Sequence, residues 1–191
     1  MQAFLISIAS IALGELGDKT QFLALILATQ LRRPLLVLLG IFLATLANHL
    51  LAALLGQWAG ALLSPRILRW TLGISFLALA VWVLIPEKAE TAPQAGDGYG
   101  ALIVTFTTFF MAEMGDKTQI VALALAAKYQ DLTAVVAGTT IGMMLVSIPT
   151  VLLAERITRL VPLKWIRVVA ALAYTLLGVL SLLGYAGVGL S

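Results

Sequence analysis

Hydrophobic residues run along the chain in long, almost unbroken segments that short polar stretches separate. A membrane-spanning helix needs about 20 mostly apolar residues, and six segments approach or exceed that length. The pattern therefore predicts an all-α polytopic membrane protein with six transmembrane helices. The predicted spans cover residues 3–28, 35–56, 67–85, 100–127, 133–154 and 165–186.

The longest polar stretch divides the chain near its midpoint. Residues 86–99 are rich in proline, glycine and acidic side chains, a composition typical of flexible linkers. We therefore expect a first three-helix repeat at residues 1–85, a flexible cytoplasmic linker at 86–99, and a second three-helix repeat at 100–191.

The two halves of the chain share a short motif. GELGDKTQ at residues 14–21 returns as AEMGDKTQ at residues 112–119, which is 98 positions later without a gap. Each half holds an odd number of predicted spans, so the second half enters the membrane from the opposite side. This arrangement is an inverted-topology repeat, which is typical of many secondary transporters.

Composition also indicates an integral membrane protein. Hydrophobic residues make up 61% of the chain and charged residues 11%, whereas soluble domains carry about 25% charged residues. We expect the lipid bilayer as a partner and no nucleic acid, because the excess Lys and Arg behind the net charge of +3 lie in the predicted loops. The absence of cysteine excludes disulfides and thiolate metal sites. The oligomeric state stays open, and the sequence is compatible with a homo-oligomer.

Basic residues in the loops predict the orientation. Seven lie on the side of the linker and three on the side of the N-terminus, so the positive-inside rule places the linker in the cytoplasm and both termini on the non-cytoplasmic side. The first eleven residues carry no basic side chain, so we expect the first apolar segment to be retained as a span. The seven are Arg32, Arg33, Lys88, Arg156, Arg159, Lys164 and Arg167, and the three are Arg66, Arg69 and Lys128.

The two motifs place ionisable residues inside predicted spans, where each charge costs roughly 2.5–3.5 kcal/mol. We expect the inverted repeats to bring these residues together near the membrane midplane. Four carboxylates and two lysines leave a charge of −2, which one divalent cation would neutralise. Oxygen ligands suit Ca²⁺, Mn²⁺ or Mg²⁺, and the reluctance of Mg²⁺ to lose water argues against it. The predicted metal ligands are Glu15, Asp18, Glu113 and Asp116.

Other motif residues are predicted to support these acids. On a continuous helix, Glu15, Asp18 and Gln21 share one oblique stripe. Lys19 follows Glu15 by four residues, the favourable order for a local ion pair, and the second motif repeats this spacing. The threonines either bond the helix backbone or bind the ion, and the glutamines either bind the ion or support its ligands. The supporting residues are Gln21, Gln119, Lys19, Lys117, Thr20 and Thr118.

Small residues and one histidine lie close to the predicted site. Gly14 and Gly17 of the first motif lie beside the stripe of Glu15, Asp18 and Gln21, where they allow another helix to approach closely or loosen the helix itself. His49 is the only histidine of the chain and lies in the second predicted span. We expect it to form a hydrogen bond between helices, with proton relay or metal contact as the alternative.

The doubled motif resembles that of the GDT-type cation/proton antiporter family. Two copies of E-x-G-D-K-T, one in each half, carry the resemblance, which extends over the six spans and the central linker. It implies that Mn²⁺ or Ca²⁺ is exported from the cytosol in exchange for protons, with the motif acids as ligands and no cofactor. Eukaryotic members of the family usually carry an N-terminal targeting extension; we expect none here, and therefore expect a prokaryotic plasma membrane or internal membrane.

Charge repulsion links the metal to the proton. Without a metal, clustered carboxylates in a low dielectric repel one another, so at least one is expected to hold a proton. A metal ion that binds there expels the proton, and this competition is the minimum requirement for antiport. One alternative is a cation channel without proton coupling. The other is an intramembrane aspartyl protease, in which Asp18 and Asp116 would share a proton, but the adjacent lysines hold both acids ionised. We therefore do not expect an enzyme.

Overall fold

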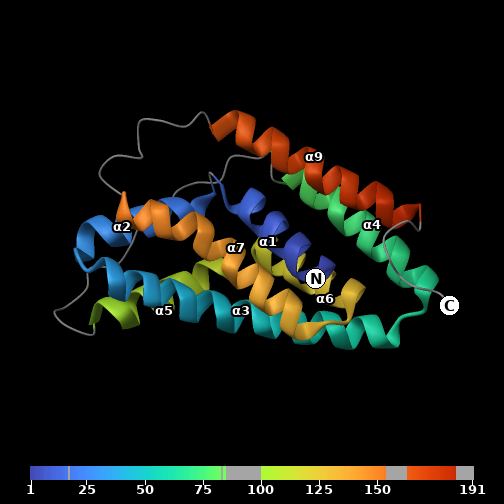
Figure 1. Cartoon of the computed structure of the whole chain (residues 1–191), viewed down its shortest axis with the longest axis horizontal. Helices are drawn as coiled ribbons and strands as arrows, with labels where there is room; N and C mark the ends of the chain where they lie inside the picture. Colours follow the sequence, from blue (N-terminus) through green and yellow to red (C-terminus); the bar gives the residue numbers. More distant parts are fainter. Residues whose placement is uncertain (17, 83, 85–99, 154–162, 184–191) are drawn as a thin grey trace.

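The described part of the chain is entirely helical. The computed structural model describes residues 1–16, 18–82, 84, 100–153 and 163–183, and these residues form eight helices without a strand (Figure 1). The all-α class is thus confirmed, whereas the predicted linker at 86–99 lies outside the described residues. The helices are α1 (Gln2–Glu15), α2 (Lys19–Leu31), α3 (Pro34–Leu62), α4 (Pro65–Trp82), α5 (Gly100–Glu113), α6 (Lys117–Tyr129), α7 (Leu132–Leu152) and α9 (Leu163–Leu182).

Two of the predicted spans are interrupted at the motifs. The prediction of continuous helices over 3–28 and 100–127 is wrong, because α1 ends at Glu15 and α5 at Glu113. The residues that follow have an extended backbone: Asp18 has φ −87° and ψ 169°, and Asp116 has φ −78° and ψ 165°. A residue with an extended backbone cannot continue the helical hydrogen bonds, so a new helix begins after each aspartate.

The interruptions shorten the apolar helices. Among the described residues, α3 and α7 are the two helices long and apolar enough to cross a membrane by themselves. The shorter α1 and α5 are predominantly apolar but hold only 14 residues each. The structure thus supports a membrane protein by the length and composition of its helices.

The second helix of each interrupted pair ends in the same way. Both α2 and α6 have 13 residues and stop at a residue in the left-handed region, Arg32 with φ 51° and Gln130 with φ 53°. The backbone N–H of each cap donates to a carbonyl four residues earlier, on Ala28 and Ala126. The two caps are 98 positions apart, so the sequence repeat extends to the backbone geometry.

Each half packs its interrupted helices against the long helix of the other half. In Figure 1, α1 runs along α7, and α5 and α6 run along α3. The contacts recur at equivalent positions, because a Cβ added to Gly40 would lie 2.7 Å from the Thr105 Cβ, and one added to Gly138 would lie 2.7 Å from the Ser7 Cβ. The small residues therefore let the helices of the two halves meet closely around the motifs.

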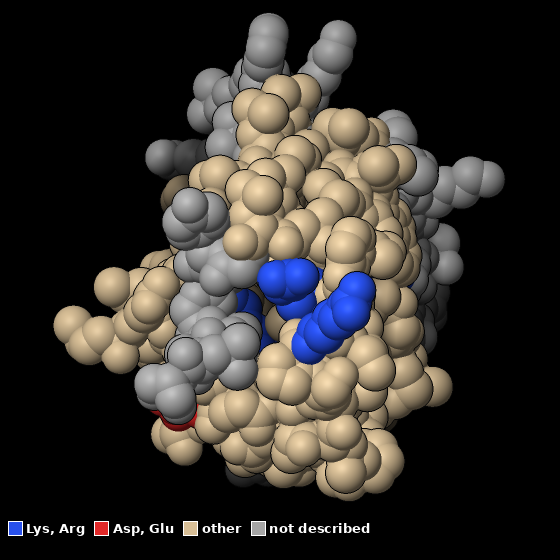
Figure 2. Space-filling model, turned by 90° about the vertical axis from the view of Figure 1, so that its right-hand side faces the viewer, with Lys and Arg blue, Asp and Glu red and all other residues tan. Residues whose placement is uncertain are grey.

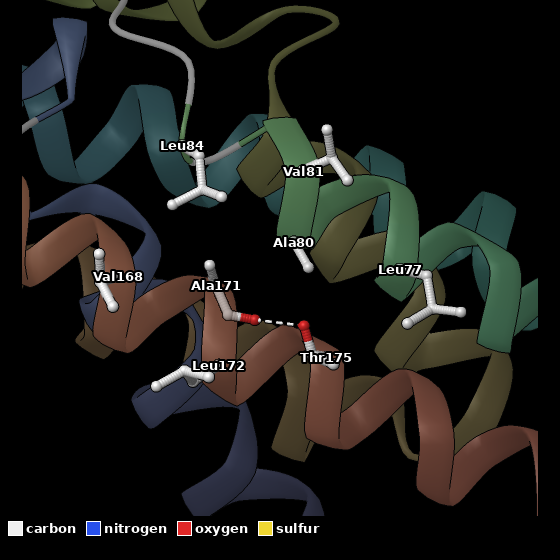
Figure 3. Close-up of a pocket in the computed structure, with 8 residues that line it drawn as sticks. All are labelled: Leu77, Ala80, Val81, Leu84, Val168, Ala171, Leu172 and Thr175. Carbon is white, nitrogen blue, oxygen red and sulfur yellow. Dashed lines mark hydrogen bonds between the residues drawn. The ribbon is translucent and has the colours of Figure 1, made fainter.

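Helices α4 and α9 form an outer pair that lies beside this core (Figure 1). They leave an open cavity of about 420 Å³ between them (Figure 3). The one hydroxyl in its lining belongs to Thr175 and donates to the backbone carbonyl of Ala171 at 2.8 Å, so the lining is apolar. The lining residues are Leu77, Ala80, Val81, Leu84, Val168, Ala171, Leu172 and Thr175.

Candidate metal site

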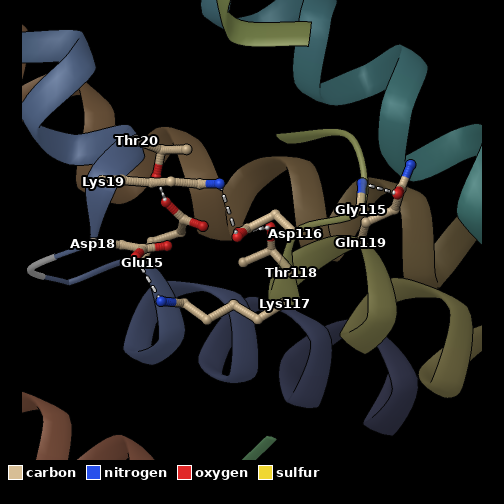
Figure 4. Close-up of polar contacts among 9 residues, drawn as sticks. All are labelled: Glu15, Asp18, Lys19, Thr20, Gly115, Asp116, Lys117, Thr118 and Gln119. Atoms are coloured by element: carbon tan, nitrogen blue, oxygen red, sulfur yellow. Dashed lines mark hydrogen bonds and ion pairs between the residues drawn. The ribbon is translucent and has the colours of Figure 1, made fainter. Parts of the chain in front are cut away.

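The two helix interruptions meet inside the bundle and bring three acids together. One carboxylate oxygen each from Glu15, Asp18 and Asp116 lies within 4.8 Å of the others, and all three side chains are buried (Figure 4). Glu15 ends α1, whereas Asp18 and Asp116 precede α2 and α6. Both halves of the chain therefore contribute to one carboxylate cluster, which we call the acid triad.

Asp18 and Asp116 do not use their carboxylates to cap the helices that follow them. Asp18 and Asp116 occupy the N-cap positions of α2 and α6, where an aspartate usually accepts a backbone N–H. Neither side chain forms such a capping bond. Both carboxylates instead face the partners described below, while the helix N-termini beside them favour negative charge.

Two lysines join the halves through crossed ion pairs. Lys117 Nζ lies 2.6 Å from Asp18 Oδ1, and Lys19 Nζ lies 3.5 Å from Asp116 Oδ1 (Figure 4). The expected local pairs with Glu15 and Glu113 are therefore replaced, because the interrupted backbone removes the i, i+4 spacing that a continuous helix would give. Each motif supplies the cation for the aspartate of the other motif.

Glu15 keeps one oxygen available within the triad. Thr20 Oγ1 donates a short hydrogen bond to Glu15 Oε2, so Thr20 bonds a side chain rather than the helix backbone. Glu15 Oε1 is buried and has no hydrogen-bond partner among the described residues. A buried polar atom without a partner is unusual, and such a carboxylate oxygen can serve as a ligand to a metal ion.

Glu113, the fourth predicted ligand, lies outside the triad and is held by α3. Its Oε1 accepts from Thr45 Oγ1 at 2.9 Å, and its Oε2 accepts from Asn48 Nδ2 at 3.4 Å. The same Asn48 amide donates to the carbonyl of Phe110 at 2.9 Å. Both carboxylate oxygens of Glu113 are thus engaged, which distinguishes it from Glu15.

The sequence of the second long helix explains this difference. The positions of α7 that match Thr45 and Asn48 in the repeat are Met143 and Val146, whose side chains offer no comparable hydrogen bond. Glu15 consequently has no equivalent polar contact with α7. The motifs are nearly identical in sequence, but their surroundings make the two glutamates different.

The motif glutamines support neighbouring groups. Gln119 Oε1 accepts the backbone N–H of Gly115 at 2.7 Å, and its Nε2 lies 3.4 Å from Asn48 Oδ1. Gln21 Nε2 donates to Thr150 Oγ1 on α7 at 3.1 Å. These contacts match the supporting role, one of the two roles left open by the sequence. Thr118 Oγ1 donates to Asp116 Oδ2 at 3.4 Å, so it orients a triad carboxylate.

The small residues of the motifs have separate roles. A Cβ added to Gly14 would lie 2.2 Å from the Tyr174 hydroxyl, so this glycine permits the close approach of α9. Gly115 has open space around it but a φ of 77°, so glycine is needed there for its backbone angle. Gly17, its counterpart in the first motif, lies outside the described residues.

Several polar contacts near the site were not predicted from the sequence. Thr45 and Asn48 interrupt an apolar span, and that interruption was the available signal. Tyr174 is fully buried and its hydroxyl donates to the Ser10 carbonyl at 2.7 Å, although no motif marks it. The expected bond of His49 is absent, since both ring nitrogens are buried without a hydrogen-bond partner among the described residues.

The charge of the cluster suits a divalent cation. The triad has three carboxylates, and the two lysines paired with it contribute two positive charges. The net charge is therefore −1, or −2 when Glu113 is included. The donors are all oxygens, which favours Mn²⁺ or Ca²⁺ over metals that prefer nitrogen or sulfur. Asp18 and Asp116 are each paired with a lysine, an arrangement that does not suit the shared proton of a protease dyad.

Comparison with known proteins gives consistent results. Residues 3–91 and 101–187 match a family described as divalent cation/proton antiporter GDT1. A Vibrio cholerae protein named putative manganese exporter is 48% identical over 172 residues, which cover 90% of this chain and 86% of that protein. A GDT1-like protein of Synechocystis is 29% identical over 202 residues, which cover 95% of this chain and 97% of that protein. No solved structure gives a significant match.

Proposed function

This chain belongs to the GDT1 family of divalent cation/proton antiporters, and from that premise we propose that it exports Mn²⁺ from the cytosol in exchange for protons. It is a transporter rather than an enzyme. The name of the Vibrio cholerae relative favours Mn²⁺ as the cargo, and Ca²⁺ is the second cation that the oxygen ligands would accept.

The acid triad is the observation that carries the proposal. Glu15, Asp18 and Asp116 come from both halves, are buried together, and include one carboxylate oxygen without a partner among the described residues. Burial of three acids is unfavourable unless a cation or a proton balances their charge. In our proposal, Mn²⁺ binds this triad, and protons replace it when it leaves.

Glu113 completes the proposed site in a second role. Thr45 and Asn48 hold both of its oxygens away from the triad in this structure. We propose that Glu113 is a ligand or proton acceptor in another conformation, in which these bonds to α3 break. The exchange of partners around Glu113 would then accompany the change of access from one side to the other.

The proposed topology has six spans in two inverted repeats. The interrupted pairs α1–α2 and α5–α6 would each count as one span, together with α3, α4, α7 and α9. The recurring caps, the recurring glycine contacts and the two matched ranges support an internal duplication. The excess of basic residues on the linker side favours a cytoplasmic linker and non-cytoplasmic termini. The site would then lie near the midplane.

A transport assay tests the proposal. The purified protein is placed in liposomes that hold a metal-sensitive dye and a pH-sensitive dye, a pH gradient is imposed, and Mn²⁺ or Ca²⁺ is added separately. We expect metal flux coupled to opposite proton flux, with Mn²⁺ preferred. Asp18→Asn and Glu113→Gln should abolish both fluxes.

A matched control removes an acid outside the site. Asp131 is exposed and caps α7 by accepting the N–H of Ala134 at 3.0 Å, so Asp131→Asn should leave both fluxes nearly unchanged. Metal flux without proton movement would indicate a channel or uniporter. Unchanged antiport in Asp18→Asn would rule out the triad as the transport site.

A further inference from the structure

A second group of charged residues lies at one end of the bundle, away from the acid triad. Arg66 and Arg69 lie in the first turns of α4, and Lys128 lies in the last turn of α6. Helix α4 packs on α6, and Gly60 shortly before α4 lies against the backbone of Ala127, next to Lys128. Figure 2 looks onto this end and shows basic side chains gathered around one hollow. We call Arg66, Arg69 and Lys128 the basic cluster.

No ion pair with a carboxylate is described for the basic cluster, and the nearby Asp131 instead caps α7. Lys128 is only 7% exposed, and the contact described for its ammonium is the Tyr129 ring, 4.8 Å from its centroid. Arg69 Nε is buried without a hydrogen-bond partner among the described residues. Within that part of the chain, no carboxylate forms an ion pair with any of the three. Because unpaired charge is costly away from water, an anion would stabilise this end.

The start of α4 adds positive potential of its own. The first N–H groups of a helix carry partial positive charge and favour acidic neighbours. The first turn of α4 contains no acid and instead contains Arg66. Ser64 immediately before the helix gives only a 3.5 Å contact to the N–H of Ile67. The N-terminus of α4 and the arginines are both positive and therefore both attract an anion, as in phosphate sites at helix N-termini.

Exposed tryptophans next to the basic cluster are typical of residues at the level of lipid headgroups. Trp58 near the end of α3 is 67% exposed, and Trp70 in α4 is 50% exposed. Exposed tryptophans of membrane proteins concentrate at the boundary between headgroups and acyl chains. Leu62 and Ile67 are also exposed beside the cluster. An anion held here is therefore expected to carry apolar chains.

From these observations we propose that Arg66, Arg69 and Lys128 bind the phosphate-bearing headgroup of an anionic phospholipid. Basic residues at a membrane surface attract anionic lipids, and the buried position of Lys128 makes this site more selective than a flat basic surface. The inference concerns a site separate from the acid triad, so it does not depend on the proposed transport of Mn²⁺.

Thermal unfolding with added ligands tests the proposal. The full-length protein in a neutral detergent is titrated with phosphatidylglycerol, phosphatidylcholine or inorganic phosphate, and unfolding is followed by tryptophan fluorescence. We expect phosphatidylglycerol alone to raise the melting temperature at micromolar concentration. The half-saturating lipid concentration should rise about fivefold in Arg66→Gln and in Lys128→Gln, because each removes one charge. Arg66→Lys and Lys128→Arg should preserve binding.

Matched variants at the opposite end of α3 control for net charge. Arg32 and Arg33 are exposed near the end of α2, so Arg32→Gln and Arg33→Gln should leave the lipid effect unchanged. Equal lipid effects in all Gln variants would overturn the proposed site. An equal, cluster-dependent effect of inorganic phosphate would show a soluble-anion site and overturn the lipid assignment. If Lys128→Gln does not fold, Arg66→Gln still decides the test, because Arg66 is exposed.

Discussion

Lys117 Nζ of the second motif lies 2.6 Å from Asp18 Oδ1 of the first motif, and both side chains are buried. The reciprocal pair of Lys19 with Asp116 is longer, at 3.5 Å, and the Lys19 side chain is 21% exposed. The two halves therefore neutralise each other's aspartates, but the two ion pairs are unequal in distance and in solvent access.

This difference between the ion pairs predicts that replacing Lys117 destabilises the protein more than replacing Lys19. Lys117→Met should lower the free energy of unfolding by about 3–5 kcal/mol, because it removes one partner of a buried ion pair. Lys19→Met should cost less, since that pair is longer and the Lys19 side chain is partly in contact with water. Denaturant titration in detergent, followed by tryptophan fluorescence, measures both. Adding Asp18→Asn to Lys117→Met should recover part of the loss, and equal costs for both lysines would contradict the prediction.

The different surroundings of the two glutamates predict different effects on metal binding. Glu15→Gln should weaken equilibrium Mn²⁺ binding at least about tenfold, because it removes charge from the triad. Glu113→Gln should weaken it less, since Thr45 and Asn48 hold that side chain outside the triad. Isothermal titration calorimetry of the purified protein compares them, with Asp131→Asn as the control. A larger loss in Glu113→Gln would show that Glu113 binds the metal directly.

The contacts of Glu113 predict an effect of Asn48 on transport. Asn48→Val copies the residue found at the equivalent position of α7, Val146, and removes the amide that bonds Glu113 and Gln119. We expect the transport rate to change by more than the Mn²⁺ affinity, because the amide holds Glu113 rather than the triad. Rates and affinities from the liposome assay separate these effects, and Asn48→Gln should behave more like the wild type.

The positive φ of Gly115 predicts that alanine is not tolerated there. Gly115→Ala should destabilise the protein by roughly 1–2 kcal/mol, the cost of a left-handed backbone for a residue with a Cβ. Gly100 provides the control, because it likewise has nothing within 4 Å of an added Cβ but no positive φ. Melting temperatures of the two variants should therefore differ clearly. Similar values would mean that the helix interruption tolerates a different backbone angle.

The contact between Gly14 and Tyr174 predicts a non-additive pair of substitutions. Gly14→Ala should be destabilising, because the new Cβ would lie 2.2 Å from the Tyr174 hydroxyl. Tyr174→Phe removes that hydroxyl and its bond to the Ser10 carbonyl, at a cost of about 1 kcal/mol. The double variant should be more stable than the sum of the single effects, which a double-mutant cycle of unfolding free energies measures. Additive effects would exclude direct contact.

The repeat predicts which acids meet, whereas hydrophobicity does not predict where the helices are interrupted. The matching motifs predicted that acids from both halves would lie together, and the structure brings Asp18 and Asp116 into one cluster with Glu15. The sequence could not predict the helix interruptions from hydrophobicity, because apolar residues resume directly after each motif and keep each segment long enough for one span. Gly115 was the visible signal, but a glycine can mark either close packing or an unusual backbone angle.

The ion pairs were mispredicted for the same reason. On a continuous helix Lys19 would lie beside Glu15, whereas the extended backbone at Asp18 turns the lysine towards the other motif. The separation of Glu113 from the triad depends on Thr45 and Asn48, which lie far away in the sequence. A single sequence gives no distance between such segments, so only the packing of α5 against α3 could reveal this difference.

The ion pairs between the two motifs also constrain the order in which the protein folds during synthesis. Asp18 is synthesised long before Lys117, so helices α1 to α4 are made before the lysine that pairs with their buried aspartate. The first half therefore cannot complete its interior alone, and the final packing of α1 and α2 has to await the second half. During biosynthesis, the early helices are expected to remain loosely associated and open to chaperones or proteases until that half arrives.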